Sequence, residues 1–156
     1  LPEAQLDRFM LELKVGYPTR EEEERIVAAT TGADTAQVTP VLTAERLGAM
    51  QRLVRRLPAP PTVVQFAVQL VRGTRPAATE ATPAMRKYVS WGAGPRASQA
   101  LVLAAKARAA MDGRAMPDLD DVRAVALPVL RHRVVLNFQA EADGMTVERL
   151  LDLRER

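Results

Sequence analysis

The segment from Arg96 to Asp112 constrains the fold more than any other part of the chain. It reads RASQALVLAAKARAAMD and is rich in Ala and Leu, which have high helix propensity. Past its first turn it is apolar on nearly every side, apart from Lys106 and Arg108. Because a helix that is apolar all round must be surrounded by other elements, we predict that it lies at the centre of a bundle.

The flanking residues predict where this central helix begins and ends. The sequence from Gly92 to Pro95, Gly-Ala-Gly-Pro, is typical of a turn. Pro95 suits the first helical position, where its missing N–H has no intrahelical partner to lose. Gly113 follows the segment, and glycine is the residue that most often stops a helix at its C-terminus.

Other helices are predicted where apolar residues recur at helical spacing between capping residues and breakers. The first follows a Thr19–Glu22 capping box, ends near Gly32 and turns Ile26 and Val27 inward. The second runs from Thr43 to Leu57 and has Leu47, Met50, Val54 and Leu57 on one face. The third covers residues 62–72 and turns Val63, Phe66, Ala67 and Leu70 inward. A short helix is predicted over residues 84–91. A longer one begins at Asp118, turns Val122, Val125 and Leu130 inward, and is expected to kink or break at Pro128. The last helix follows Thr146, with Val147, Leu150 and Leu151 as its apolar residues.

One strand is predicted near the start of the chain. Leu11 to Val15 alternates apolar and polar residues and is bounded by Gly16 and Pro18. So short a strand needs a sheet, and the rest of the sequence supplies none. We therefore predict an all-α helical bundle with a short N-terminal strand remnant. This pattern, together with a first residue that is Leu1 and not Met, leads us to expect a fragment of a larger protein.

Composition narrows the classes of protein that the chain can represent. The absence of cysteine excludes disulfides and thiolate metal sites and agrees with a reducing compartment, so we expect a cytoplasmic location. No apolar run approaches the roughly 20 residues of a membrane span. The 22 basic and 19 acidic residues are interspersed, which indicates a mixed solvated surface, so we expect neither a membrane nor a nucleic-acid partner.

Catalytic motifs are missing from the sequence. There is one histidine, His132, and a serine triad would have to combine it with Ser90 or Ser98, neither of which lies in a nucleophile elbow. No phosphate-binding glycine loop of either common type is present. Acidic pairs do not share metal-ligand spacing with His132, so no metal site is predicted. The chain alone is not expected to be a working enzyme.

Two arginines are candidates for binding an anion. Arg8 follows Leu-Asp just before the predicted strand, and Arg96 directly follows the Gly-Ala-Gly-Pro turn at the start of the central helix. A helix N-terminus favours anions, and a guanidinium beside it adds bidentate recognition of phosphate. The alternative for each is an ordinary surface arginine in an ion pair.

Each of three further features can be interpreted in two ways. Tyr88 and Trp91 are either packing residues or, for a minority view, base-stacking residues. The cluster Arg131-His132-Arg133 either complements the C-terminal end of a helix or contacts another domain or a nucleotide.

Several long motifs resemble the MoxR family of AAA+ ATPases. They are LPEAQLDRFM (1–10) followed by LELKVGYPTREEE, YVSWGAGPRASQALVLAAKARAAMDGR (88–114) and DVRAVALPVLRHRVVLNFQAEADG (121–144). They occur in order and extend over essentially the whole chain. The commonest family variant has serine where this chain has Gly94, which is expected to loosen the turn slightly and to leave Arg96 in place.

The resemblance implies a division of the chain and roles for both arginines. Residues 1–17 would be the C-terminal remnant of an α/β ATPase core, with the arginine finger and the last strand, and residues 18–156 the helical lid. Arg8 would be the arginine finger that acts in trans on the γ-phosphate of a neighbouring subunit. Arg96 would be the sensor-2 arginine that contacts the phosphates bound by its own subunit.

The same resemblance implies cofactors and partners. The intact protein would bind ATP and Mg²⁺, with the magnesium ligands and the Walker A and B motifs outside this chain, so the intact protein would be an ATPase and the fragment alone inactive. It would work as a homo-oligomeric ring with a chaperone-like remodelling or maturation role, in some cases beside proteins with von Willebrand factor A domains.

Two alternatives remain open at this point. One is a stand-alone helical module that binds a protein or nucleic acid without any ATPase core. The other is a relative of the second half of a magnesium-chelatase ATPase subunit, which would share the fold and both arginines. The sequence SWGAGPRAS favours the MoxR branch over the chelatase branch.

Overall fold

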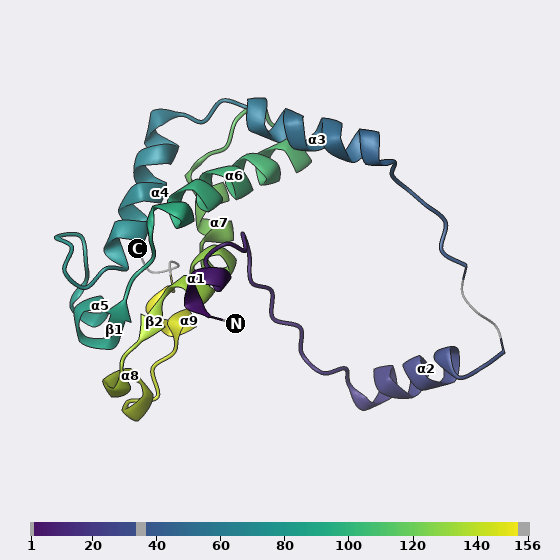
Figure 1. Cartoon of the computed structure of the whole chain (residues 1–156), viewed down its shortest axis with the longest axis horizontal. Helices are drawn as coiled ribbons and strands as arrows, with labels where there is room; N and C mark the ends of the chain where they lie inside the picture. The colour runs from purple at the N-terminus through teal and green to yellow at the C-terminus, as the bar shows by residue number, and fades with distance from the viewer. Residues whose placement is uncertain (1, 34–36, 153–156) are drawn as a thin grey trace.

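The computed structural model describes residues 2–33 and 37–152, which form a mostly helical molecule (Figure 1). The helices are α1 (Glu3–Leu6), α2 (Arg20–Thr30), α3 (Ala44–Arg56), α4 (Pro61–Gly73), α5 (Pro83–Tyr88), α6 (Pro95–Met111), α7 (Leu119–Leu130), α8 (Phe138–Ala142) and α9 (Val147–Leu150). A 3₁₀ turn, η1 (Arg131–Arg133), follows α7, and the strands are β1 (Val89–Trp91) and β2 (Val135–Leu136).

Helix α6 is the centre of the bundle, as its sequence predicts. It packs against α4 and α7 along its length and against α3 toward one end (Figure 1). Most of its buried side chains are alanines, which let neighbouring backbones approach closely: Ala97, Ala100, Leu101, Ala104, Ala105 and Ala109. Gly94 is its N-cap, Pro95 its first residue, and Gly113 takes a positive φ of 72° just beyond its C-terminus.

Helices α4 and α7 supply the other two walls of the core. Val63 and Ala67 of α4 are buried as predicted, whereas Phe66 and Leu70 are partly buried at the edge of the core. On α7, Val122 and Leu130 are buried and Val125 is partly buried. The helix continues through Pro128 to Leu130, so the break predicted at Pro128 does not occur, and the chain tightens into η1 only after Leu130.

The start of α7 is fixed by a buried carboxylate. Asp118 and Asp121 form a capping box, and Asp121 is 1% exposed. The guanidinium of Arg114 donates to both Asp121 oxygens, at 2.7 and 2.6 Å, and this holds the pKa of Asp121 below its usual value. The Arg114–Asp121 pair therefore ties the loop after α6 to the first turn of α7.

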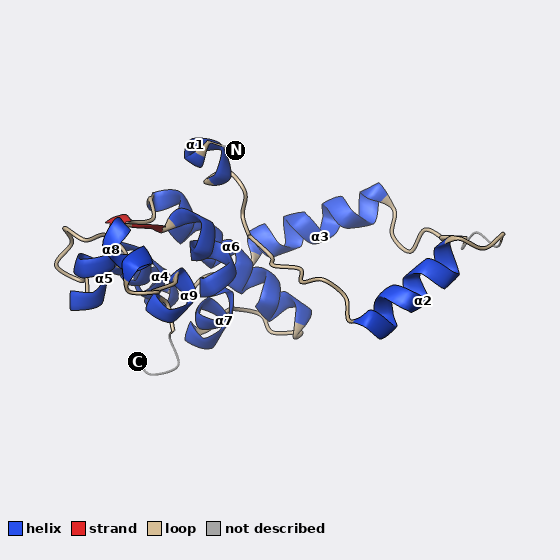
Figure 2. Cartoon of the chain, turned by 90° about the horizontal axis from the view of Figure 1, so that it is seen from below, coloured by secondary structure: helices blue, strands red, loops and turns tan. Residues whose placement is uncertain are grey.

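Helices α2 and α3 form with the predicted caps, but α2 lies away from the core and α3 meets the bundle only at one end (Figures 1 and 2). Thr19 and Glu22 make the expected capping box, and Thr43 caps α3. The prediction that Ile26 and Val27 point into a core is wrong, because the two side chains are 51% and 53% exposed. Apolar spacing shows which face of a helix is suited to burial but not which element covers it.

The apolar face predicted for α3 is likewise only partly covered. Leu47 and Met50 are about half exposed, whereas Val54 and Leu57, nearer to α6, are partly buried. The end of α3 therefore joins the bundle and its beginning projects from it.

The β structure lies elsewhere than predicted. Residues 11–15 are extended but form no strand, because no ladder partner lies beside them; the amide of Glu12 instead donates to the carbonyl of Pro128 at 2.8 Å. The two described strands pair antiparallel, Val89 with Leu136 and Trp91 with Val135. The helix predicted over 84–91 therefore stops at Tyr88, where the chain enters β1. The helical fold class is nevertheless confirmed.

The turn before α6 depends on close backbone approach at one glycine. A Cβ on Gly92 would lie 2.5 Å from the carbonyl oxygen of Thr74 and 2.7 Å from backbone atoms of Arg75. The buried Thr74 hydroxyl accepts the amide of Ala93 at 2.9 Å. The loop after α4 and the turn before α6 are thus held together by contacts between their backbones.

Gly92→Ser and Gly94→Ser place the same side chain at two nearby positions with opposite expected results. Gly92→Ser should lower the free energy of unfolding by about 1–3 kcal/mol, because backbone must shift to admit the Cβ. At Gly94 a Cβ meets open space, and serine is a good N-cap for α6, so Gly94→Ser should be neutral or stabilising by a few tenths of a kcal/mol. Urea unfolding of the two variants measures both effects, and equal stabilities would contradict this account of the turn.

Candidate functional site

Arg133 of η1 makes the most extensive set of hydrogen bonds near the candidate arginines. Its side chain is 2% exposed. Nε donates to Asp7 Oδ1 at 2.9 Å, and Nη2 donates to the carbonyls of Asp7 and Phe9 at 3.0 and 2.5 Å. Nη1 donates to the carbonyls of Met10, at 3.2 Å, and Val129. The five donors of this guanidinium thus have five acceptors, and the carboxylate of Asp7 compensates its buried charge.

The other members of the Arg131-His132-Arg133 cluster bind the same segment. His132 Nε2 lies 3.0 Å from the Phe9 carbonyl, which can only accept, so this nitrogen carries the proton. Arg131 Nη1 donates to the Glu12 carbonyl at 3.4 Å. All three side chains reach residues 7–12, and Arg133 also donates to the Val129 carbonyl in the last turn of α7, so both interpretations of this cluster stay open.

A second ion pair fixes the same segment further along. Glu148 lies between Lys14 Nζ, at 2.5 Å, and Arg131 Nε, at 3.0 Å. The hydrogen bond from Lys14 lowers the pKa of Glu148 to about 2. The stretch from Asp7 to Lys14 is therefore docked on η1 and α9 by charged and backbone contacts.

Asp7 brings Arg96 to the same place. Its Oδ2 accepts from Arg96 Nη1 at 3.1 Å, while its Oδ1 accepts from Arg133. Arg96 lies in the first turn of α6, at a helix N-terminus that no side chain caps, and its side chain is 53% exposed. One face of its guanidinium is thus open to an anion beside a helix terminus that favours negative charge.

Arg8 directly follows Asp7 and behaves differently. It is exposed, and its amide donates to the Gln5 carbonyl at 3.1 Å in the turn that ends α1. Within residues 2–33 and 37–152 its guanidinium has no hydrogen bond or ion pair. Asp7 therefore links the two candidate arginines, which are far apart in sequence. Its carboxylate is bonded to Arg96, and Arg8 is the residue that follows it.

Sequence reasoning missed Asp7 and Arg133. Asp7 stands beside the candidate Arg8, and Arg133 lies within a cluster that the sequence singled out. The signal that joins them is a contact between residues more than a hundred positions apart, which periodicity and local motifs do not report.

The remaining candidates do not form a catalytic group. Ser90 Oγ donates to the carbonyls of β2, at 3.1 and 3.3 Å, and His132 holds the Phe9 carbonyl, so neither serves a triad. Tyr88 is partly buried against the core, and its hydroxyl donates to Asp143 at 3.0 Å, as suits a packing residue. Trp91 is 72% exposed, so the structure does not support its interpretation as a packing residue.

The described residues offer neither a metal site nor a membrane-spanning helix. No group of three or more His, Asp or Glu side chains there could hold a metal ion. No helix in the described ranges has the length and apolar character that crossing a bilayer requires.

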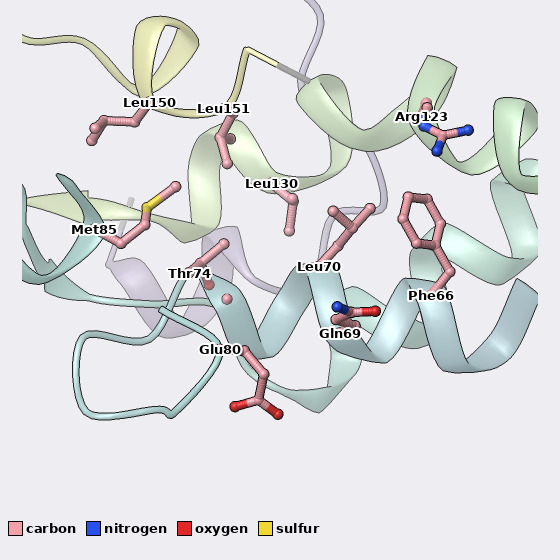
Figure 3. Close-up of a pocket in the computed structure, with 11 residues that line it drawn as sticks. Phe66, Gln69, Leu70, Thr74, Glu80, Met85, Arg123, Leu130, Leu150 and Leu151 are labelled. Carbon is pink, nitrogen blue, oxygen red and sulfur yellow. The ribbon is translucent and has the colours of Figure 1, made fainter. Parts of the chain in front are cut away.

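The pocket in Figure 3 is apolar and lies between α4, the end of α7 and α9. Its volume is about 250 Å³, and its lining includes Leu150 and Leu151 from the C-terminal part of the chain. Arg123 lies over the Phe66 ring, 4.9 Å from its centroid, and the Glu80 carboxylate pairs with Arg72, which lowers the pKa of Glu80 to about 2. Its charged groups are already paired, and Gln69 and Thr74 are the neutral polar residues of its lining.

Comparison with known proteins places this geometry in context. Residues 82–153 match the AAA lid domain family. The chain is 35% identical to Chaperone MoxR1 of Mycobacterium tuberculosis over 95% of its length and 39% of that protein. It is 33% identical to Protein MoxR of Methylorubrum extorquens over 87% of its length and 43% of that protein.

A solved structure agrees with the whole arrangement. The crystal structure of a candidate ATPase from Cytophaga hutchinsonii matches with a TM-score of 0.87 and 28% identity, over 97% of this chain and 46% of that one. The chain thus spans less than half the length of the relatives that it matches. The resemblance found in the sequence is confirmed: residues 82–153 match the AAA lid domain family, and the chain is similar to MoxR proteins along nearly its whole length.

Proposed function

We propose that this chain is the lid and arginine-finger portion of a MoxR-like AAA+ ATPase. The observation that carries the proposal is the position of Arg96, a half-exposed guanidinium at the open N-terminus of the central lid helix. The similarity of the chain to MoxR proteins supports the same proposal. Residues 1–17 would belong to the ATPase core and residues 18–156 to the lid.

The residues of this chain fit one part of an ATP site. Arg96 has a single partner, Asp7, and a face open to solvent, so it can bind a phosphate oxygen in its own subunit. ATP supplies the phosphoryl group that is transferred to water. The magnesium ligands and Walker motifs would come from the core, since the described residues hold no metal-binding cluster.

Arg8 fits the role of an arginine finger. It is exposed, it lacks an internal partner within the described ranges, and the turn that carries it is fixed by Arg133. Such an arginine stabilises the charge on the γ-phosphoryl oxygens and raises the rate by about 10³–10⁵-fold. Because it would act on the nucleotide of a neighbouring subunit, the proposal requires a homo-oligomeric ring.

The wider role follows from the family. We propose a cytoplasmic, chaperone-like ATPase that uses hydrolysis to remodel or mature client proteins, with von Willebrand factor A domain proteins as possible partners. The lid would convert nucleotide state into movement, because only the triphosphate offers Arg96 its terminal oxygens.

The first prediction concerns Arg8 in the intact protein. Arg8→Ala should lower ATP turnover by about 10³-fold or more while leaving the Kd for ATP unchanged, because the finger acts only on the transition state. Arg46→Ala, which removes another exposed arginine, on α3, is the matched control and should keep normal turnover.

A mixing test then asks whether Arg8 acts between subunits. Arg8→Ala subunits are mixed with subunits that lack the Walker lysine, each inactive alone. Activity should return, because an intact nucleotide site then meets an intact Arg8 across some interfaces. No recovery on mixing would contradict action in trans. An intact protein without any turnover would instead favour the stand-alone interaction module.

The second prediction separates Arg96 from Arg8. Arg96→Ala should weaken ATP binding by about 10-fold or more, the size expected for a lost hydrogen bond to a charged group, and should also lower turnover. Titration calorimetry of the intact protein measures the Kd. If Arg96→Ala bound ATP as tightly as the wild type, the sensor-2 assignment would be wrong.

A further inference from the structure

We propose that Asp7 is a positioning residue that couples the lid arginine Arg96 to the turn carrying Arg8, by competing with nucleotide phosphate for Arg96. The inference rests on the proposed function. It adds a link within one subunit between the arginine that senses its own nucleotide and the arginine that serves its neighbour.

The first step is the division of the Asp7 carboxylate between two cations. Oδ1 faces Arg133 at 2.9 Å and Oδ2 faces Arg96 at 3.1 Å. Asp7 itself is partly exposed, at 34% of its side chain. The Asp7 carboxylate therefore bridges Arg96 of α6 and Arg133 of η1.

The second step is that Arg133 is held more firmly than Arg96. Arg133 is 2% exposed and makes four further hydrogen bonds to carbonyls, so it cannot leave without exposing a buried charge. Arg96 is 53% exposed, and within the described residues its side chain is bonded to Asp7 alone. An ion pair this exposed changes an equilibrium by only about fivefold or less, so a phosphate, which guanidinium binds in bidentate fashion, can displace it.

The third step leads from Asp7 to Arg8. The turn that holds both residues is closed by the amide of Arg8 on the Gln5 carbonyl, at 3.1 Å, and the amide of Phe9 on the Leu6 carbonyl, at 3.0 Å. When Arg96 turns to phosphate, Asp7 keeps only Arg133, and the position of the next residue, Arg8, responds. By linkage, any state of the turn that favours the Asp7–Arg96 pair must weaken ATP binding to the same extent.

Asp7→Asn removes the contact with Arg96 and also the carboxylate charge that compensates Arg133. The amide oxygen of asparagine can still accept from Arg133 Nε, while its NH₂ group replaces the oxygen that faces Arg96. The substitution therefore removes the competitor for phosphate and retains the hydrogen bond to the buried guanidinium.

The test is a double-mutant cycle on the ATP Kd of the full-length ATPase, with wild type, Asp7→Asn, Arg96→Ala and the double variant. Asp7→Asn should tighten ATP binding about two- to fivefold, the range of an exposed ion pair, and this gain should vanish in the Arg96→Ala background. Turnover at saturating ATP should fall, because the contact between position 7 and Arg96 can no longer re-form after hydrolysis, when the terminal phosphate oxygens have left, and Arg8 is then not repositioned for the next cycle. Asp120→Asn, which breaks an exposed pair with Arg123, is the control and should alter neither quantity.

This opposite movement of affinity and turnover separates positioning from mere structure. Loss of folding would weaken binding and lower turnover together. An unchanged Kd in Asp7→Asn, or a gain that persists without Arg96, overturns the coupling while the proposed function stands on wild-type turnover and its loss in Arg8→Ala. A wild-type protein without turnover overturns both.

A second measurement needs no Asp7 variant and covers the case in which Asp7→Asn does not fold. Hydrogen exchange of the Arg8 and Phe9 amides should be faster in wild-type protein with ATP than without it. The same comparison in Arg96→Ala should show no difference. Identical ATP effects in the two proteins would overturn the coupling.

Discussion

The buried guanidinium of Arg133 is the interaction on which the candidate site depends. Its five hydrogen bonds fix the turn from Asp7 to Met10 against η1, although no regular element joins the two. A charge this buried is tolerated only with a carboxylate partner and a full set of acceptors, so Asp7 and the nearby carbonyls are required together. The turn that presents Arg8 is thereby anchored to η1.

The second requirement is the alanine-lined packing of α6. Small side chains let α4 and α7 approach α6 closely, and the Gly92 contact with the Thr74–Arg75 backbone then sets where α6 begins. Since Arg96 lies in that first turn, its position follows from core packing and not from a flexible loop. A change at Gly92 would therefore displace Arg96 as well as destabilise the fold.

Local sequence rules predicted what is local. Caps at Thr19, Thr43, Asp118 and Thr146, the limits of α6 and the helical class are all as expected, because each depends on neighbouring residues. The errors concern partners: alternation over 11–15 predicted a strand that the structure does not form, since the pattern could not supply one to pair with, and helical spacing in α2 could not supply a covering element. The Asp7–Arg133 contact was missed for the same reason, whereas the identities of Arg8 and Arg96 came from resemblance to a family.

Three arginines near one carboxylate differ in how firmly they are held, and this order matches the work proposed for each. Arg133 has five acceptors and is buried, Arg96 has one partner and is half exposed, and Arg8 has no side-chain partner within the described ranges. A structural cation should be immobile, a sensor should exchange one partner for another, and a residue that acts on a neighbouring subunit should be free of its own. Asp7 touches the first two and precedes the third, so a change at either bonded arginine reaches Arg8 through a single side chain and one peptide unit.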